Sequence, residues 1–451
     1  METQCYKAYK IKLTLQIMKV KNQQAILSKL GIEELNPMQE EASLAIHSAK
    51  EVMILSPTGT GKTLAFLLPV IAELKQNIDG AQAMVIAPSR ELAIQIEQVA
   101  REMGTGYKIN VVYGGRNFSR DRQELSTQPS LIIGTPGRLA DHLRRGTLAA
   151  EHIKTIVFDE FDKALEVGFE GEMSEILNLL PAVTKKILTS ATNGVAVPKF
   201  VGITDPLVID HLSDGVAKLN LRGIVSPDKD KMETLALALK HLGNQPGIIF
   251  CNYKDSIQRV SDYLSKLGID HGTFYGGMEQ KDRERALIKF RNGTHQLLIA
   301  TDLAARGIDV PEIKFIIHYH LPHRAEEFTH RNGRTARMHR EGTAYVLYWE
   351  GEDLPDFIHI DRQEYLAEAP DLRRSEWSTL FISGGRQDKI SKGDIAGLLF
   401  KQGKLERDQV GNIELKQDCA FVAVKSAVAG QVIPLVDQTK LKKKKVRVRE
   451  I

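Results

Sequence analysis

The sequence predicts an α/β fold, with two parallel-sheet domains in tandem and a small α+β domain behind them. Apolar runs of strand length alternate with helical stretches along most of the 451 residues, which is the pattern of parallel sheets covered by helices. A hydrophobic content of 42% at this length is enough to bury separate compact cores. We expect an N-terminal segment without an assigned role at 1–30, the first sheet domain at 31–210, a polar connection at 211–230, the second sheet domain at 231–372 and the α+β domain at 376–451.

Short apolar runs mark the strands of the two expected sheets. The polar connection between the domains contains Pro227, and we expect a helix to start near Lys231. The strand runs are 52–55, 84–86, 131–133, 156–158 and 187–188 in the first domain, and 247–250, 297–299, 315–317 and 345–347 in the second.

A glycine-rich turn links the strand at 52–55 to the apolar helix that continues through 64–68. The turn reads Ser-Pro-Thr-Gly-Thr-Gly-Lys-Thr over 56–63, and Ser56 stands where the usual phosphate-loop pattern has glycine. Backbone N–H groups in such a turn point at phosphate oxygens, and the helix N-terminus adds partial positive charge. We therefore expect Lys62 to pair with the outer phosphates of a nucleotide and the Thr63 hydroxyl to ligate its magnesium ion.

Two adjacent carboxylates, Asp159 and Glu160, directly follow the strand run 156–158. They would lie at the edge of the sheet where parallel α/β proteins bind ligands. Asp159 suits magnesium, and Glu160 suits the orientation of a water molecule. Adjacent acids also begin solvated helices, so the assignment depends on the preceding phosphate loop.

The α+β domain has the order β-α-β-β-α-β, which is an RNA-recognition topology. Strands are expected at 379–383, 410–416, 419–425 and across the basic C-terminal stretch, with helices from Ser391 and after Ser426. Alternation along a strand puts Phe381 and Phe421 on the outer face of the sheet, where unstacked bases could lie on their rings. Val446 and Val448 would face the core, and the cations Lys445, Arg447 and Arg449 would share the outer face. Ordinary packing of the two rings is the alternative.

From about Gly31 onward the chain resembles the DEAD-box RNA helicases, and its motifs occur in that family's order. The resemblance implies two RecA-like domains that bind ATP, Mg²⁺ and RNA, with arginine fingers at Arg334 and Arg337. Phe161 replaces the alanine of the acidic motif, which raises a question about packing beneath the site. The implied catalytic residues are Lys62, Asp159, Glu160, Arg334 and Arg337, and the implied coupling residues are Asp162, Ser190, Thr192 and His330.

The stretch 31–39 resembles the glutamine motif of the family, in which an amide reads the edge of adenine. Gln39 supplies that amide here, but Ile32 replaces an aromatic residue and no phenylalanine stands near Thr14. A helix-starting surface amide is the alternative for Gln39. The expected nucleotide-binding residues are Gln39, Ser56, Thr58, Gly59, Thr60, Gly61, Lys62, Thr63 and, at the ribose, Asp309.

Further family motifs imply contacts with the sugar-phosphate backbone of RNA. Exposed amides, hydroxyls and arginines at strand ends grip a backbone without reading bases, although glycine and proline at such places can simply form turns. The implied core contacts are Pro88, Arg90, Gly115, Arg116, Thr135, Gly137, Arg138, Gln280, Arg283, Thr301, Arg306 and Gly307.

The C-terminal domain resembles the RNA-binding domain of bacterial DbpA-type helicases, which act on large-subunit ribosomal RNA. The likeness rests on the turn at 383–389 and on 411–413 and 421–424. Two surfaces compete as the RNA site, the flat sheet face and the basic turn. The expected contacts are Arg386, Lys389, Phe421, Lys445 and Arg447.

The cysteines Cys5, Cys251 and Cys419 are far apart and lack metal-site spacing, and Cys251 is expected to fill a core. No segment approaches the roughly 20 apolar residues of a membrane span. These two observations favour a cytoplasmic protein. The family resemblance implies an ATP- and Mg²⁺-dependent helicase that remodels structured RNA, with 23S ribosomal RNA as its expected partner, and we expect it to be a monomer. The alternatives are an ATP-gated RNA clamp with slow turnover and a DNA translocase.

Overall fold

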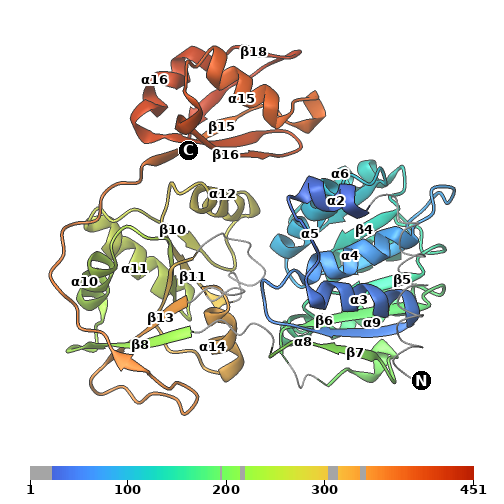
Figure 1. Ribbon diagram of the computed structural model, residues 1–451, viewed down its shortest axis with the longest axis horizontal. Coiled ribbons are helices and arrows are strands. Elements are labelled where there is room, and N and C mark those ends of the chain that lie inside the picture. Colours follow the sequence, from blue (N-terminus) through green and yellow to red (C-terminus); the bar gives the residue numbers. More distant parts are fainter. Residues whose placement is uncertain (1–22, 193–195, 214–218, 303–312, 336–341) are drawn as a thin grey trace. The chain divides into compact units, whose positions relative to one another are not determined.

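The computed structural model describes residues 23–192, 196–213, 219–302, 313–335 and 342–451 (Figure 1). These residues form two compact units, 23–213 and 219–451. We call 23–213 the first core domain, 219–363 the second core domain and 377–451 the tail domain. The predicted roles of Arg306, Gly307, Asp309 and Arg337 fall on residues outside the described ranges.

A seven-stranded sheet forms the centre of the first core domain, in the order β3-β4-β2-β5-β6-β1-β7. Neighbouring strands pair in parallel throughout, as predicted. The strands are β1 (Glu51–Leu55), β2 (Ala83–Ile86), β3 (Ile109–Val112), β4 (Leu131–Gly134), β5 (Thr155–Phe158), β6 (Lys185–Ser190) and β7 (Leu207–Asp210).

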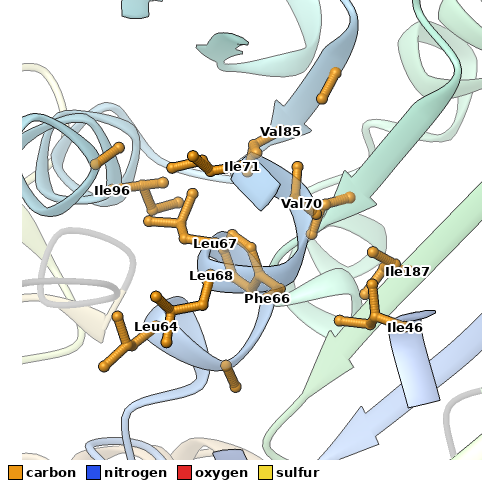
Figure 2. Packing of buried hydrophobic residues seen from close by; sticks show 14 of the residues in the cluster. Ile46, Leu64, Phe66, Leu67, Leu68, Val70, Ile71, Val85, Ile96 and Ile187 are labelled. Atoms are coloured by element: carbon orange, nitrogen blue, oxygen red, sulfur yellow. The ribbon is translucent and has the colours of Figure 1, made fainter. Parts of the chain in front are cut away.

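Helices bury apolar side chains against both faces of this sheet, in two separate clusters. Helix α4 is buried along nearly its whole length, and Figure 2 shows Phe66 and Leu67 among side chains such as Ile96 and Ile187. This packing fixes the start of α4, where the phosphate loop ends. The helices are α2 (Gln23–Leu30), α3 (Pro37–Ser48), α4 (Lys62–Glu73), α5 (Arg90–Glu102), α6 (Phe118–Leu125), α7 (Pro136–Arg144), α8 (Phe161–Glu166) and α9 (Glu170–Asn178), with a 3₁₀ turn η1 (Lys199–Val201).

The second core domain repeats the architecture with another seven-stranded parallel sheet, in the order β10-β11-β9-β12-β13-β8-β14. Cys251 is fully buried in its core, as predicted. The elements are β8 (Leu219–Ser226), α10 (Met232–Leu242), β9 (Gly247–Phe250), α11 (Lys254–Lys266), β10 (His271–Phe274), α12 (Gln280–Arg291), β11 (Leu297–Ala300), β12 (Phe315–His318), α14 (Ala325–Asn332), β13 (Gly342–Trp349) and β14 (Arg362–Gln363).

Strand β8 corrects the prediction for the segment between the two core domains. Residues 219–226 were expected to belong to the polar connection at 211–230, but they pair with β13 over eight positions. Leu221 and Ile224 from this strand are buried. The interspersed Asn220, Arg222 and Gly223 broke the apolar run, so the strand was not recognised in the sequence.

The tail domain is an antiparallel four-stranded sheet, in the order β16-β17-β15-β20, with two helices on one face. This confirms the predicted α+β domain. The basic C-terminal stretch is not one strand as expected, because it forms a short hairpin before β20, although Val446 and Val448 are buried as predicted. The elements are β15 (Trp377–Ile382), η2 (Arg386–Asp388), α15 (Lys392–Lys401), η3 (Arg407–Gln409), β16 (Val410–Leu415), β17 (Ala420–Lys425), α16 (Ser426–Val436), β18 (Lys440–Leu441), β19 (Lys444–Lys445) and β20 (Val448–Glu450).

The outer face of the tail sheet contacts the end of α12 within the second unit. Arg291 makes a bidentate ion pair with Glu414, at 2.7 and 2.9 Å through Nη2. Asn292 Nδ2 donates to Thr379 Oγ1 at 3.1 Å, and both residues are buried. Burial alone would raise the pKa of Glu414, but the charges of Lys416 and Arg291 bring it below its usual value. A half-buried charge pair with further hydrogen bonds gives this contact a defined geometry.

Candidate nucleotide and RNA site

The phosphate loop runs from the end of β1 to the first residue of α4. Gly59 and Gly61 adopt φ values of 84° and 87°, which L-residues rarely adopt. Lys62 is buried, and its Nζ donates to the backbone oxygens of Ser56 and, at 2.8 Å, of Pro57. The ammonium group therefore lies inside the turn, where phosphate oxygens would be bound.

Gln39 lies directly against this loop. Its Nε2 donates to the Gly61 backbone oxygen at 3.2 Å, and its Oε1 accepts from the Asn36 backbone N–H at 3.1 Å in a capping box at the start of α3. A Cβ at Gly61 would come within 2.4 Å of Gln39 Nε2. The residue is thus both a helix-capping amide and part of the loop wall, and its adenine-reading role stays a prediction.

Asp159 and Glu160 lie at the carboxyl end of β5, as the sequence indicated. The Thr189 hydroxyl donates to Asp159 Oδ1 at 2.5 Å and accepts from the Glu160 backbone N–H at 3.0 Å. Burial, and then the charge of Glu160, raises the pKa of Asp159 to about 6. Glu160 has a φ of 48°, a left-handed conformation that is costly for a residue other than glycine and often occurs at functional sites.

The residues available for a magnesium ion are hard oxygen donors, which is the chemistry that Mg²⁺ prefers. Thr63 and Asp159 follow the loop and β5, and the raised pKa of Asp159 marks a carboxylate whose charge is not fully compensated. In the part of the chain that the structure describes, no cluster of three acidic, histidine or cysteine side chains could hold a metal by itself. These residues therefore fit an ion that arrives with nucleotide phosphates and keeps water ligands.

The acidic motif continues into α8, where the predicted contact between Asp162 and Thr192 is present. Thr192 Oγ1 donates to Asp162 Oδ2 at 3.2 Å, and the Thr192 backbone N–H donates to Ser190 Oγ at 3.1 Å. The coupling role of these residues stays a prediction. Phe161 is 3% exposed and packs edge-on against Phe158, with ring centroids 5.8 Å apart. The unusual phenylalanine therefore packs into the hydrophobic core of the domain.

The expected RNA elements of the first core domain meet beyond the ends of β2, β3 and β4. Arg90, at the start of α5, lies against the Gly114–Gly115 turn, and a Cβ at Gly115 would come within 2.7 Å of Arg90 Nη1. Gly115 also has a φ of 83°. Thr135 joins this edge through a 3.2 Å hydrogen bond from its backbone N–H to the Val112 oxygen. Pro88 precedes α5, and Gly137 lies in the first turn of α7.

Arg116 and Arg138 are not free side chains, because both bind Asp121. Arg138 Nη2 lies 2.7 Å from Asp121 Oδ2, and Arg116 Nε lies 3.1 Å from Oδ1. Burial alone would raise the pKa of Asp121, but hydrogen bonds from His142 and Arg138 and the charge of Arg116 bring it below its usual value. The two arginines hold the turns at this edge of the sheet in place, a role that the sequence did not indicate for them. Asp121 was missed because Arg138 and His142 are 17 and 21 positions away, and no local pattern marks its pairing with the nearer Arg116.

In the second core domain a single buried arginine joins several strand ends. Arg331 is 1% exposed and binds Asp302 twice at 2.6 Å. It also donates to Asn252 Oδ1 and to the His320 backbone oxygen, both at 2.7 Å. No local pattern predicts a role for Arg331, although it lies between His330 and Arg334. His330 and Arg334 are both buried, with 8% and 6% exposure.

The remaining predicted RNA residues of this domain lie on α12 and β11. Gln280 and Arg283 belong to the first turn of α12, and the Arg283 guanidinium lies 4.7 Å from the Phe274 ring centroid. Thr301 follows β11 and donates its backbone N–H to the Phe274 oxygen at 3.2 Å.

In the tail domain, the predicted contacts differ in accessibility. Lys389, Lys445 and Arg447 are exposed and Arg386 is half-buried. Phe421 shares the outer face with Phe381, as predicted, but it is 5% exposed. Its burial favours packing and corrects the expectation that its ring offers an open surface to a base.

Comparison with known proteins places these features in a family. The sequence matches the DEAD/DEAH box helicase family over residues 36–199, the helicase conserved C-terminal domain over 230–339 and the DbpA RNA binding domain over 379–450. It is 32% identical to the ATP-dependent RNA helicase DbpA of Escherichia coli over 438 residues, covering 94% of this chain and 96% of that protein. The chain belongs to the DbpA-type DEAD-box RNA helicases.

Other relatives agree with this assignment. The ATP-dependent RNA helicase DbpA of Bacillus subtilis is 28% identical over 460 residues, covering 94% of this chain and 96% of that protein. The structure of S. cerevisiae Dbp5 bound to RNA and ADP BeF3 is 27% identical, with a TM-score of 0.64 over 71% of this chain and 85% of that one. DEAD-box helicase Mss116 bound to ssRNA and UDP-BeF, at 24% identity and a TM-score of 0.68 over 77% of this chain and 78% of that one, supports the fold alone.

As a DbpA-type helicase, the chain is an RNA-stimulated ATPase that uses nucleotide and binds RNA. Within the described ranges, every helix is too short or too polar to cross a bilayer.

Proposed function

We propose that this helicase couples hydrolysis of Mg²⁺-bound ATP to local separation of RNA strands in 23S ribosomal RNA during ribosome assembly in the cytoplasm. The observation that carries the nucleotide part is the buried Asp159, oriented by Thr189 and with a pKa raised to about 6. A carboxylate in this state gains most from a neighbouring cation. The match to the DbpA RNA binding domain supports the RNA part.

The proposed chemistry assigns one task to each group at the site. Lys62 neutralises the outer phosphates, and Thr63 and Asp159 hold the magnesium ion. Glu160 orients the attacking water, while Arg334 and Arg337 stabilise charge that develops on the transferred phosphoryl group. Gln39 reads the adenine edge. Arg337→Ala should accordingly hydrolyse ATP poorly while it retains RNA.

We propose that ATP and RNA each engage both core domains, so that binding of one favours the closed state that binds the other. Backbone contacts to one bent strand would exclude its pairing partner. Because one chain carries all of these residues, we propose that it acts as a monomer, which sedimentation would test.

ATPase assays with total RNA, ribosomal RNA fragments and sequence-matched DNA test this proposal. We expect RNA to stimulate turnover, ribosomal fragments to stimulate it most, and DNA to have little effect. Equal stimulation by DNA would indicate a DNA translocase. An ATP-gated clamp would bind RNA without multiple-turnover strand displacement, so a displacement assay separates it from a helicase.

Deletion of residues 376–451 tests the role of the tail domain. We expect the truncated chain to keep RNA-stimulated hydrolysis on generic strands and to lose its preference for ribosomal fragments. Arg291 would lose its partner Glu414 in this deletion, so Arg291→Met in the full chain serves as a control for the disturbed α12. Selectivity unchanged by the deletion would refute the proposed role.

A further inference from the structure

A crevice separates α12 of the second core domain from the outer face of the tail sheet. It has a volume of about 930 Å³ and is lined by Lys281 and Arg285 from α12 and by Phe381, Lys445, Arg447 and Arg449 from the tail domain, among other residues. We call it the α12–tail crevice. Its two walls come from segments about 100 to 170 positions apart, so it exists only when the tail domain is docked.

The crevice has a surplus of cations without protein partners. In the described part of the chain, the side chains of Lys281, Lys445 and Arg447 form no ion pair, and Arg285 has only a distant one, 3.9 Å from Asp282. Lysine and arginine on an exposed wall without counter-charges are suited to phosphate.

The acidic groups of the lining are largely committed elsewhere. Glu284 pairs with Lys416 at 3.3 Å, and the Asp437 carboxylate accepts from the Val448 backbone N–H at 2.7 Å. Asp418 also lines the crevice, and its side chain hydrogen-bonds Cys419. Lysine and arginine side chains without an ion pair therefore give the crevice its positive charge.

The docking contact gives the crevice fixed walls. Arg291 of α12 pairs with Glu414 of β16, and Asn292, directly after α12, donates a buried hydrogen bond to Thr379 of β15. On the tail wall, the Arg449 guanidinium lies 5.4 Å from the Phe381 ring centroid. Phe381 is half-buried, and both Phe381 and Arg449 line the crevice. Aromatic rings and arginine planes are the groups on which single-stranded bases stack.

Helix α12 connects this crevice to the RNA elements of the helicase core. Gln280 and Arg283, which carry the family's RNA motif, belong to the same two turns as Lys281 and Arg285. Lys281 and Arg285 are four residues apart and lie on one side of the helix. A strand that contacts the first turn of α12 would therefore need to advance only a nucleotide or two to reach the crevice.

We propose that the α12–tail crevice binds single-stranded RNA that flanks the segment held by the core. Phosphates contact Lys281, Arg285, Lys445 and Arg447, and one base lies against Phe381 and Arg449. This inference rests on the proposed function and adds a site formed jointly by a core domain and the tail domain. RNA is favoured over an acidic protein segment because the cations alternate with an aromatic ring and because the chain belongs to an RNA-binding family.

The test uses the full chain with Lys281→Ala and Arg285→Ala combined. RNA hairpins with a single-stranded extension at the 5′ end, at the 3′ end or at neither end are titrated by fluorescence anisotropy over a salt series. We expect about tenfold weaker binding of one extended hairpin and a salt slope lower by about 1.4, from two lost single-strand phosphate contacts. The blunt hairpin should bind as before.

A matched control removes two exposed lysines elsewhere, Lys266→Ala on α11 and Lys401→Ala on α15, with the same change in net charge. Phe381→Leu keeps an apolar side chain and should reduce photocrosslinking of a 4-thiouridine extension to the tail domain. Equal losses in control and crevice variants, or wild-type binding of every extended hairpin, would overturn the inference. Binding of an acidic peptide in the crevice that leaves RNA binding unchanged would also overturn it. If RNA does not stimulate ATP turnover in the wild type, the proposed function fails. That result is measured independently of hairpin binding, so it can be told apart from a failure of the crevice proposal.

Discussion

The two core domains share one sheet architecture but treat the carboxylates at their strand ends in opposite ways. In the first, Asp159 is buried with its charge under-compensated, and its pKa rises to about 6. In the second, Asp302 is bound twice by the buried Arg331 guanidinium. The first domain holds a buried carboxylate whose charge a bound cation can neutralise, whereas the second neutralises its carboxylate with its own arginine.

This difference indicates a division of labour that the common fold does not reveal. Perturbed carboxylates in clefts are typical of catalytic sites, whereas a fully hydrogen-bonded ion pair fixes geometry at the cost of burying charge. The first core domain would therefore carry the metal and phosphate chemistry. The second would present its arginines from a rigid frame built around Arg331.

The largest expected effect is on activity in the first core domain. Lys62→Ala should lower nucleotide binding and reduce ATP turnover by about a thousandfold, because the turn loses the charge that faces the phosphates. Equilibrium nucleotide binding and steady-state ATPase measure the two effects. The control is Lys75→Ala, beyond the end of α4 and exposed, which should keep both. Near-normal turnover in Lys62→Ala would show that the first core domain does not carry the phosphate chemistry as proposed.

Glu160→Gln should bind ATP and RNA but hydrolyse ATP about a hundredfold more slowly, since the amide cannot assist the attacking water as the carboxylate does. Single-turnover hydrolysis with RNA present separates this step from binding. The backbone at Glu160 keeps the same conformational demand in the variant, so folding should be unchanged. Normal turnover would overturn the assignment of Glu160.

A pair of isosteric variants tests the contrast between the two carboxylates directly. Asp302→Asn leaves Arg331 buried without its counter-charge and should lower the free energy of unfolding of the second unit by about 3–5 kcal/mol. Asp159→Asn removes an under-compensated buried charge and should raise the stability of the first core domain by about 1–2 kcal/mol. Both tryptophans, Trp349 and Trp377, lie in the second unit, so their fluorescence reports the first variant, and calorimetry reports the second. Equal changes in stability in the two variants would show that the two carboxylates do not differ in how their charge is compensated.

Phe161→Ala restores the residue usual in the family but leaves a cavity beside Phe158. We expect a loss of about 3 kcal/mol in the stability of the first core domain. Phe161→Leu fills most of the space and should cost less. Calorimetry measures both, and an alanine variant as stable as the wild type would show that the site does not depend on this packing.

The smallest effect concerns pH and the second core domain. Burial, and then the charge of Arg331, lowers the pKa of His318 to about 3. Because the unfolded chain binds a proton near pH 6.5 and the folded one does not, stability is full above pH 6.5. It falls by about 1.4 kcal/mol per pH unit as the pH drops towards 3. Tryptophan fluorescence unfolding at pH 7.0 and 5.5 should show a smaller difference for His318→Gln than for the wild type.

Much of the fold and of the nucleotide site follows from local sequence. The phosphate loop and Asp159 could be predicted because a strand, a turn and a helix lie within a few residues of each other. Thr189 and Arg331 could not, because their partners are 11 to 79 residues away. Asp121 could not, because Arg138 and His142 are 17 and 21 residues away and no local pattern marks its pairing with the nearer Arg116. Strand β8 was missed because its polar and glycine positions resemble a connection, and only pairing with β13 reveals it.

The link between Arg291 and Glu414 spans 123 positions of the sequence. If either residue changes alone, the other is left without its opposite charge. Swapping this tail for that of a distant homologue should give a poorly joined chimera unless the receiving positions on α12 are exchanged with it. We therefore expect the tail domain and the positions of α12 that bind it to change together.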